Sequence, residues 1–242
     1  MDLFIVTVAF CFGLVFGSFF NVVIYRLPRG LSLVKPGSSC PICGHRLRAG
    51  ELIPVLSFLW QRGACRVCGE KISWRYPVVE LVTGLGFAFI SWTSSSWTEL
   101  AVGLVFYSFL LVLALIDLDH KLLPNVLTLS GVGLGLVFSL LGWTIPFGQS
   151  VLGAAVGFAV IVAIVVISRG GMGMGDAKLM ALIGSFLGWQ AVFYVLFWGS
   201  VVGSISGIIY LYLTRQDKKT PLPFGPSLAV AAIVLYFVFL AP

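Results

Sequence analysis

The chain has 242 residues, of which 59% are hydrophobic and only 10% are charged, and its mean hydropathy is +1.06. Because soluble domains carry about 25% charged residues, these values exclude a soluble globular domain, a disordered chain and a coiled coil. The net charge of +6 is interpreted as basic loops beside an anionic membrane face, and no nucleic-acid partner is expected.

Apolar stretches separated by polar, Pro-rich or Gly-rich breaks follow one another along the chain, and each is interpreted as a membrane-spanning helix. The eight stretches are 2–25, 78–92, 98–116, 125–143, 148–168, 177–189, 191–213 and 225–241. The stretch 177–189 is short for a full crossing, so a count of seven spans stays open. The predicted fold class is an all-α polytopic membrane protein of about eight transmembrane helices, with a small cytoplasmic module between helices 1 and 2.

The lysines and arginines indicate which side of the membrane each loop occupies. Nine of the fifteen lie in 26–77. The other six are Lys121, Arg169, Lys178, Arg215, Lys218 and Lys219. With eight spans, all fifteen fall on one side of the bilayer, which the positive-inside rule makes the cytoplasmic side. Both termini are then expected on the opposite side.

The first hydrophilic segment contains two Cys-x-x-Cys pairs, each followed by glycine. The pairs are Cys40 with Cys43 and Cys65 with Cys68. This spacing is typical of a tetrahedral Zn²⁺ site, and a reducing cytoplasm argues against disulfides. Four thiolates leave no open coordination position, so the zinc is expected to be structural. The predicted domains are a first transmembrane helix (1–25), a zinc-binding module (26–77) and a transmembrane bundle (78–242).

Carboxylates occur where two of the predicted spans meet the cytoplasmic face. Asp117 and Asp119 end the third span, and Asp176 precedes the sixth. Two carboxyl groups at a partly desolvated site can share a proton and hold a water between them, as aspartic proteases require. Gly173 and Gly175 would let an extended substrate approach the backbone. The alternatives are that Asp176 is only a helix N-cap, that Asp117 and Asp119 mark the membrane boundary, or that the aspartates form an ion or proton pathway.

Sequence segments spread over nearly the whole chain resemble those of the bacterial type IV prepilin peptidases, which are membrane aspartic proteases with a GxGD motif. The matching segments are GSFFNVVIYRLP at 17–28, the two Cys-x-x-Cys pairs, RYPVVE at 75–80, IDLDHKLLP at 116–124, GMGDAKL at 173–179 and PFGP at 223–226. Each segment alone is a weak signal. Together, in the family's order and on the predicted side of the membrane, they are highly specific.

The resemblance implies an endopeptidase that removes the basic leader of prepilins or pseudopilins, after a glycine, at the cytoplasmic face of the bacterial inner membrane. Carried over by position, the catalytic pair is Asp117 and Asp176, with Asp119 as the rival for the first place. The resemblance further implies methylation of the new N-terminus with S-adenosylmethionine. Glu80 is the residue suggested for that step, and it is equally well explained as an acid in the first turns of a helix.

Two other classes of protein use similar residues. One is an ion- or proton-coupled carrier with intramembrane aspartates, which flux across sealed vesicles would detect. The other is a non-enzymatic, zinc-bearing assembly scaffold, whose function would survive replacement of Asp117 or Asp176 by asparagine.

Overall fold

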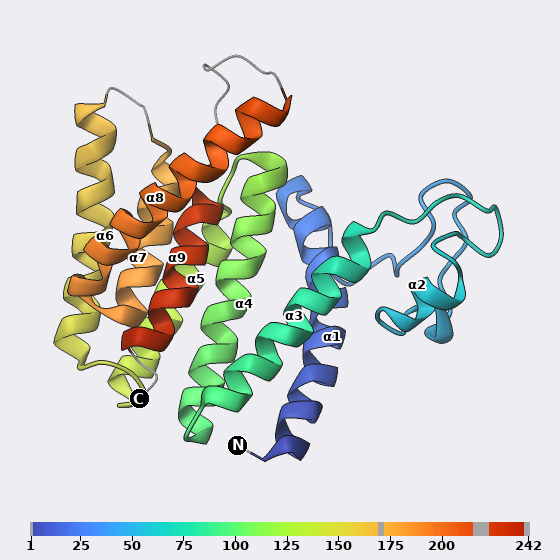
Figure 1. Cartoon of the computed structure of the whole chain (residues 1–242), viewed down its shortest axis with the longest axis horizontal. Coiled ribbons are helices and arrows are strands. Elements are labelled where there is room, and N and C mark those ends of the chain that lie inside the picture. The colour runs from blue at the N-terminus through green and yellow to red at the C-terminus, as the bar shows by residue number, and fades with distance from the viewer. Residues whose placement is uncertain (1, 169–171, 215–222, 240–242) are drawn as a thin grey trace. The chain divides into compact units, whose positions relative to one another are not determined.

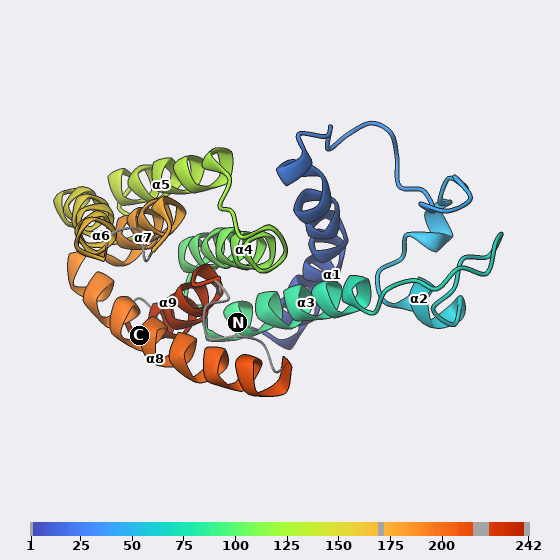
Figure 2. The same cartoon turned by 90° about the horizontal axis from the view of Figure 1, so that it is seen from above.

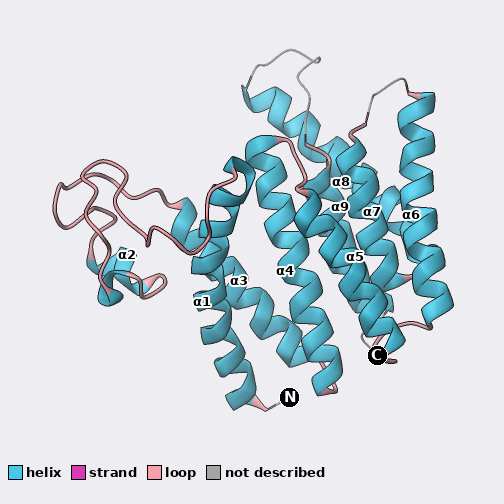
Figure 3. Cartoon of the chain, turned by 180° about the vertical axis from the view of Figure 1, so that it is seen from behind, coloured by secondary structure: helices cyan, strands magenta, loops and turns pink. Residues whose placement is uncertain are grey.

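The computed structural model describes residues 2–168, 172–214 and 223–239, and these residues form a helical protein (Figures 1 and 3). The α-helices are α1 (Leu3–Arg26), α2 (Leu56–Trp60), α3 (Arg75–Thr93), α4 (Trp97–His120), α5 (Asn125–Leu140), α6 (Phe147–Ile167), α7 (Met174–Leu187), α8 (Trp189–Thr214) and α9 (Gly225–Phe239). Short 3₁₀ helices lie at Leu27–Arg29 and Ala49–Glu51. The described ranges contain two isolated β-bridges and no strand, which confirms the predicted all-α class.

Each predicted apolar stretch coincides with one helix, namely α1, α3 and then α4 to α9 in order. Five of the described helices are long and apolar enough to cross a membrane. They are Leu3–Arg29, Arg75–Thr93, Trp97–His120, Phe147–Ile167 and Trp189–Tyr212. The helices α5 and α9 are apolar but shorter, and α7 has 14 residues, as the short stretch 177–189 indicated. The protein is therefore a multi-pass membrane protein.

The chain divides into two compact units, Met1–Ser94 and Ser95–Pro242. In the first unit α1 packs along α3, and the cysteine-containing segment connects them. The two helices approach backbone to backbone: a Cβ on Gly13 would lie 2.8 Å from Gly84 Cα, and one on Gly17 would lie 2.6 Å from Glu80 Cα. Small residues permit such close packing between membrane helices.

The second unit is built around α7, which packs against α5, α6, α8 and α9 (Figure 2). Every residue of α7 from Asp176 to Leu187 is buried except Lys178. A helix that is apolar on all sides belongs inside a bundle, which explains how a helix too short to span a membrane lies among longer ones. Glycines on the neighbours make room for it, because Gly135 of α5 faces Phe186 and Gly157 of α6 faces the Met180 backbone.

Four helix ends meet at one end of the second unit. The Gly225 N–H, at the start of α9, donates to Asp117 Oδ2 near the end of α4, with an N···O distance of 3.1 Å. Lys178 Nζ in α7 donates to Asn125 Oδ1, the first residue of α5, at 2.6 Å. These two contacts bring the carboxylate-bearing segments to one place. Four of the basic residues behind the sidedness prediction lie outside the described residues, and the sidedness stays a prediction. They are Arg169, Arg215, Lys218 and Lys219.

Candidate active site and metal centre

Asp117 lies in the last turn of α4 with only 6% of its surface exposed. A charged side chain at such a position needs a hydrogen-bond partner, and the Gly225 N–H supplies one. A Cβ on Gly225 would stand 2.7 Å from Asp117 Oδ2, so only glycine lets α9 approach the carboxylate this closely. The start of α9 therefore fixes the position of the Asp117 side chain.

Asp176 is the third residue of α7, and it is 8% exposed. The sequence left open that Asp176 is the N-cap, but α7 begins at Met174 and its N-cap is Gly173. The Asp176 carboxylate reaches back and accepts the Gly173 N–H at 3.3 Å. A carboxylate in the first turn also interacts favourably with the helix dipole. The backbone thus holds Asp176 at the buried end of the central helix.

The carboxyl groups of Asp117 and Asp176 are close enough for the charge of the first to act on the second. Both are buried, whereas Asp119 is exposed. Two buried carboxyl groups that interact in this way can share one proton, so that one acts as a base and the other as an acid. The structure thus brings together Asp117 and Asp176, the pair preferred from the sequence.

The two glycines expected to admit a substrate have different surroundings. Gly173 is exposed, and its N–H is used by the Asp176 carboxylate. Gly175 faces the connection between α4 and α5, where an added Cβ would lie 3.2 Å from the side chain of Leu123. Gly175 therefore allows the first turn of α7 to pack against Leu123, and its role in substrate approach stays a prediction.

The four cysteines of the module form one cluster, in which every pair of sulfur atoms lies within 4.8 Å. Cys40 Sγ is 3.8 Å from Cys68 Sγ, and Cys43 Sγ is 4.0 Å from Cys65 Sγ. Four thiolates at about 2.3 Å from a tetrahedral Zn²⁺ stand about 3.8 Å apart. The donor set and its spacing therefore suit a metal ion.

The two Cys-x-x-Cys-Gly loops have the same local structure. The backbone carbonyl oxygens of Cys40 and Cys65 each accept a hydrogen bond from the N–H of the glycine four residues later, at 3.0 and 2.9 Å. Gly44 and Gly69 have φ angles of +70° and +73°, in the left-handed region that favours glycine. Short bridges, Ser39 with Arg46 and Ala64 with Lys71, close the loops.

Backbone N–H groups within these loops favour the thiolate forms that bind metal. The N–H groups of Cys43 and Ile42 lower the pKa of the Cys40 thiol to about 7. The Glu70 N–H acts in the same direction on Cys68, but burial and the facing thiols raise the pKa of Cys68 to about 12. Crowded thiols resist losing all their protons unless a cation lies between them, which is the role of a bound metal.

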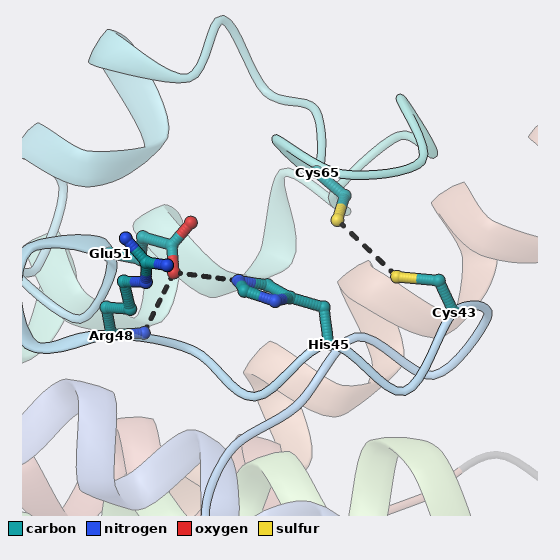
Figure 4. A network of polar contacts seen from close by, with 5 residues as sticks. All are labelled: Cys43, His45, Arg48, Glu51 and Cys65. Atoms are coloured by element: carbon teal, nitrogen blue, oxygen red, sulfur yellow. Dashed lines mark hydrogen bonds and ion pairs between the residues drawn. The ribbon is translucent and has the colours of Figure 1, made fainter.

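A polar network follows the first loop (Figure 4). Glu51 Oε2 accepts the Arg48 N–H at 2.8 Å and lies 3.2 Å from His45 Nε2. The Arg48 N–H, followed by His45, lowers the pKa of Glu51, so its carboxylate is ionised at neutral pH. Because the carbonyl of His45 also accepts the Cys40 N–H at 2.9 Å, this network supports the loop that carries the first two cysteines.

Glu80, suggested from the sequence for methyl transfer, is buried in α3. Its Oε2 accepts the Val55 N–H at 2.8 Å, and Ser18 lies within hydrogen-bonding reach of the carboxyl group. The carboxylate thus connects α3 to the segment just before α2. Glu80 is in the first unit and the aspartate pair is in the second.

Two residues of the aspartate site received no role from the sequence. Gly225 belongs to the PFGP segment at 223–226 that was quoted for the resemblance. The sequence signal that could have singled it out is a glycine placed between two prolines where a helix begins. Asn125, which accepts from Lys178, had no signal at all because its partner is 53 residues away. Contacts between distant segments leave no periodic pattern in the sequence.

Comparisons with known proteins match both units. Residues 11–94 match the bacterial peptidase A24 N-terminal domain, and residues 104–208 match the type IV leader peptidase family. A prepilin leader peptidase/N-methyltransferase of Aeromonas salmonicida is 41% identical over 93% of this chain and 88% of its own length. Proteins of the same name from Bacillus subtilis and Pseudomonas aeruginosa are 37% and 38% identical, over 95% and 90% of this chain and 93% and 85% of their own lengths. No solved structure matches the chain.

Proposed function

The chain belongs to the type IV leader peptidase family, and from that membership we propose that it is a membrane aspartic endopeptidase that removes the leader of prepilins or pseudopilins. The observation that carries the proposal is the position of two buried carboxyl groups, Asp117 and Asp176, at one end of the second unit, where the charge of the first acts on the second. The carrier and the scaffold considered from the sequence are not favoured, because the family and the named relatives are peptidases.

The mechanism is general acid–base hydrolysis with Asp117 and Asp176 as the catalytic residues. One carboxylate removes a proton from water as the water oxygen attacks the carbonyl carbon of the scissile bond. The other carboxyl group, still protonated, donates to the carbonyl oxygen. The tetrahedral intermediate then collapses and the C–N bond breaks. The departing amine takes the proton that the first carboxylate removed from water, and the second carboxylate regains a proton as the carbonyl group re-forms. No covalent acyl-enzyme forms.

The structure supports a positioning role for the backbone at this site. The N–H groups of Gly225 and Gly173 each hold one oxygen of an aspartate, which leaves the other oxygen of each for water and substrate. Such preorganised groups need little rearrangement during the reaction. Asp119, on the exposed side of the last turn of α4, takes no part in the proposal.

The metal of the first unit is proposed to be Zn²⁺, held by Cys40, Cys43, Cys65 and Cys68 in a structural role. Zinc content measured by mass spectrometry of the elements should be one ion per chain and should be lost in Cys40→Ser. The matched control is Cys11→Ser, because Cys11 is an exposed thiol of α1 outside the cluster. Zinc retained by Cys40→Ser and lost from Cys11→Ser would contradict the assignment.

A second activity, N-methylation of the new N-terminus with S-adenosylmethionine, is proposed from the names of the relatives. Glu80 stays the suggested residue for this step. The proposed location is the bacterial inner membrane with the aspartate pair at the cytoplasmic face, where the basic residues of the loops are expected.

The proposal is tested by intact mass spectrometry of a purified prepilin incubated with the full-length protein, zinc and S-adenosylmethionine. The expected product has lost its leader and gained one methyl group. Loss of the leader without gain of a methyl group would support the peptidase activity and contradict the methyltransferase activity. An unchanged mass for several prepilins and pseudopilins would overturn the peptidase.

A further inference from the structure

An apolar surface lies on and just before α2, in the most basic part of the chain. We call it the α2 surface, and its residues, 39% to 64% exposed, are Leu52, Ile53, Leu56, Leu59 and Trp60. On the helix, positions 56, 59 and 60 share one face. Phe58 points the other way and is buried, with its ring centroid 4.7 Å from that of Trp74. The side chains of the α2 surface are therefore the apolar ones that the local core, formed by Phe58 and Trp74, leaves exposed.

A hydrogen bond ties this segment to a predicted span. The Val55 N–H, immediately before α2, donates to Glu80 Oε2 inside α3 at 2.8 Å. Glu80 is five residues beyond Arg75, the first residue of α3, which corresponds to about 7.5 Å along the helix axis. Figures 1 and 2 show α2 next to the beginning of α3. The α2 surface is thus level with the first turns of a membrane-crossing helix.

The backbone at this tie is strained. Val55 has φ +62° and ψ −51°, and the Leu56 N–H donates to the Pro54 carbonyl at 2.6 Å, which makes a γ-turn. A β-branched residue rarely adopts positive φ, so the surrounding contacts must stabilise the turn. The buried carboxylate of Glu80 is one such contact, and the turn directs the chain into α2.

The charges and aromatic residues around α2 suit a membrane surface. Residues 26–77 contain nine lysines and arginines against two acidic residues, and the exposed Arg62 lies two residues beyond the end of α2. Trp74, at the start of α3, is 69% exposed beside Phe58. Basic side chains attract anionic lipid head groups, and tryptophans gather at the membrane–water boundary.

We propose that the α2 surface inserts into the head-group boundary of an anionic bilayer and holds the cysteine module against the membrane. Interfacial helices bury their apolar face about 5–10 Å into this boundary, and the Val55–Glu80 hydrogen bond holds the segment before α2 beside the first turns of α3, where the boundary is expected. The inserted segment is an anchor for the module, and Glu80 is the residue that positions it. The inference does not depend on the peptidase activity.

Photocrosslinking in the full-length protein tests the proposal. Leu59→p-benzoylphenylalanine, in vesicles of phosphatidylethanolamine and phosphatidylglycerol, is expected to give a lipid adduct on illumination. The matched control is Val67→p-benzoylphenylalanine, because Val67 is similarly exposed, at 63%, but lies between two of the metal-binding cysteines. It should give no lipid adduct. Retained zinc verifies that each variant is folded.

An adduct between Leu59 and a second protein copy, no adduct with lipid, or equal lipid adducts at both positions would overturn the anchor. The role of Glu80 is tested in the Leu59-labelled protein. Glu80→Ala removes the acceptor for the Val55 N–H and should reduce the lipid adduct, whereas Glu80→Gln keeps an acceptor oxygen and should restore it. An adduct that is unchanged in Glu80→Ala would refute the positioning role.

Discussion

At the aspartate pair and next to the cysteine cluster, a single backbone N–H holds each important carboxylate in place. Gly225 holds Asp117, Gly173 holds Asp176, and Arg48 holds Glu51. Asp117 and Asp176 could be named from the sequence because charged residues are expensive near a membrane and rare in this chain, whereas Glu51 was not named. Their backbone partners could not, since any residue has an N–H and only the folded chain shows which one is used.

Gly225→Ala should strongly reduce the rate of leader cleavage without unfolding the protein. The added methyl group would stand 2.7 Å from Asp117 Oδ2 and push the carboxylate aside. A displacement of about 1 Å at a catalytic group can cost about a hundredfold in rate, which is the loss expected in the initial rate of leader removal. Gly148→Ala is the matched control, because Gly148 lies in the first turn of α6 with open space around it. Equal rates for the two variants would count against a positioning role for Gly225.

Glu51→Gln should weaken zinc binding by about tenfold at pH 7, which is typical of a lost contact next to a metal site. Because folding lowers the pKa of Glu51, its carboxylate stabilises the module above the ordinary glutamate pKa. That contribution is lost as the pH falls through the lowered pKa of Glu51. The difference in zinc affinity between wild type and Glu51→Gln should therefore become smaller in acid. Competition with a chromophoric chelator across pH measures it.

Glu70→Gln is the control for this comparison, because Glu70 is an exposed carboxylate of the same module that directly follows the second cysteine loop, in the place that His45 has after the first. It should bind zinc like the wild type. A Glu51→Gln difference that stays constant with pH would mean that the charge of Glu51 is not the cause.

At the scale of helices, the second unit is organised by the short central helix α7. Its length and burial follow from its sequence, which is apolar on every side and too short to span a membrane. Glycines on α5 and α6 let those helices approach it closely. The sequence shows these glycines but not which of them face α7, because glycine has no hydropathy pattern of its own.

Gly153→Ala should destabilise the second unit by about 1–3 kcal/mol, the usual cost of overpacking. A Cβ at this position would collide with the carbonyl oxygen of Gly184 in α7, and backbone atoms cannot turn aside as a side chain can. Thermal unfolding in detergent measures the change. In the control, Gly133→Ala, the new methyl group meets open space on α5, and better helix propensity should leave stability equal or higher. A stable Gly153→Ala variant would show that α6 and α7 can separate without cost.

Over the whole molecule, the sequence predicted the order and approximate bounds of the eight apolar helices, α1 and α3 to α9, because apolar stretches of this length have few other structures available in a membrane. It did not predict the short helix α2. It did predict the four-cysteine cluster, since the Cys-x-x-Cys spacing is local. Contacts between distant segments were not predictable. The Glu80–Val55 bond and the Gly225–Asp117 bond join residues far apart in the chain and depend on tertiary packing alone.

The central claim is that Asp117 and Asp176 form the catalytic pair, and one comparison tests it most directly. Asp117→Asn, Asp119→Asn and Asp176→Asn are incubated with the same prepilin, and leader removal is followed by intact mass. Methyl transfer to a pilin cleaved beforehand, measured in parallel, reports whether each variant is folded. We expect Asp117→Asn and Asp176→Asn to lose cleavage, Asp119→Asn to retain it, and all three to methylate. Cleavage by either of the first two variants, or its loss in Asp119→Asn alone, would contradict the assignment.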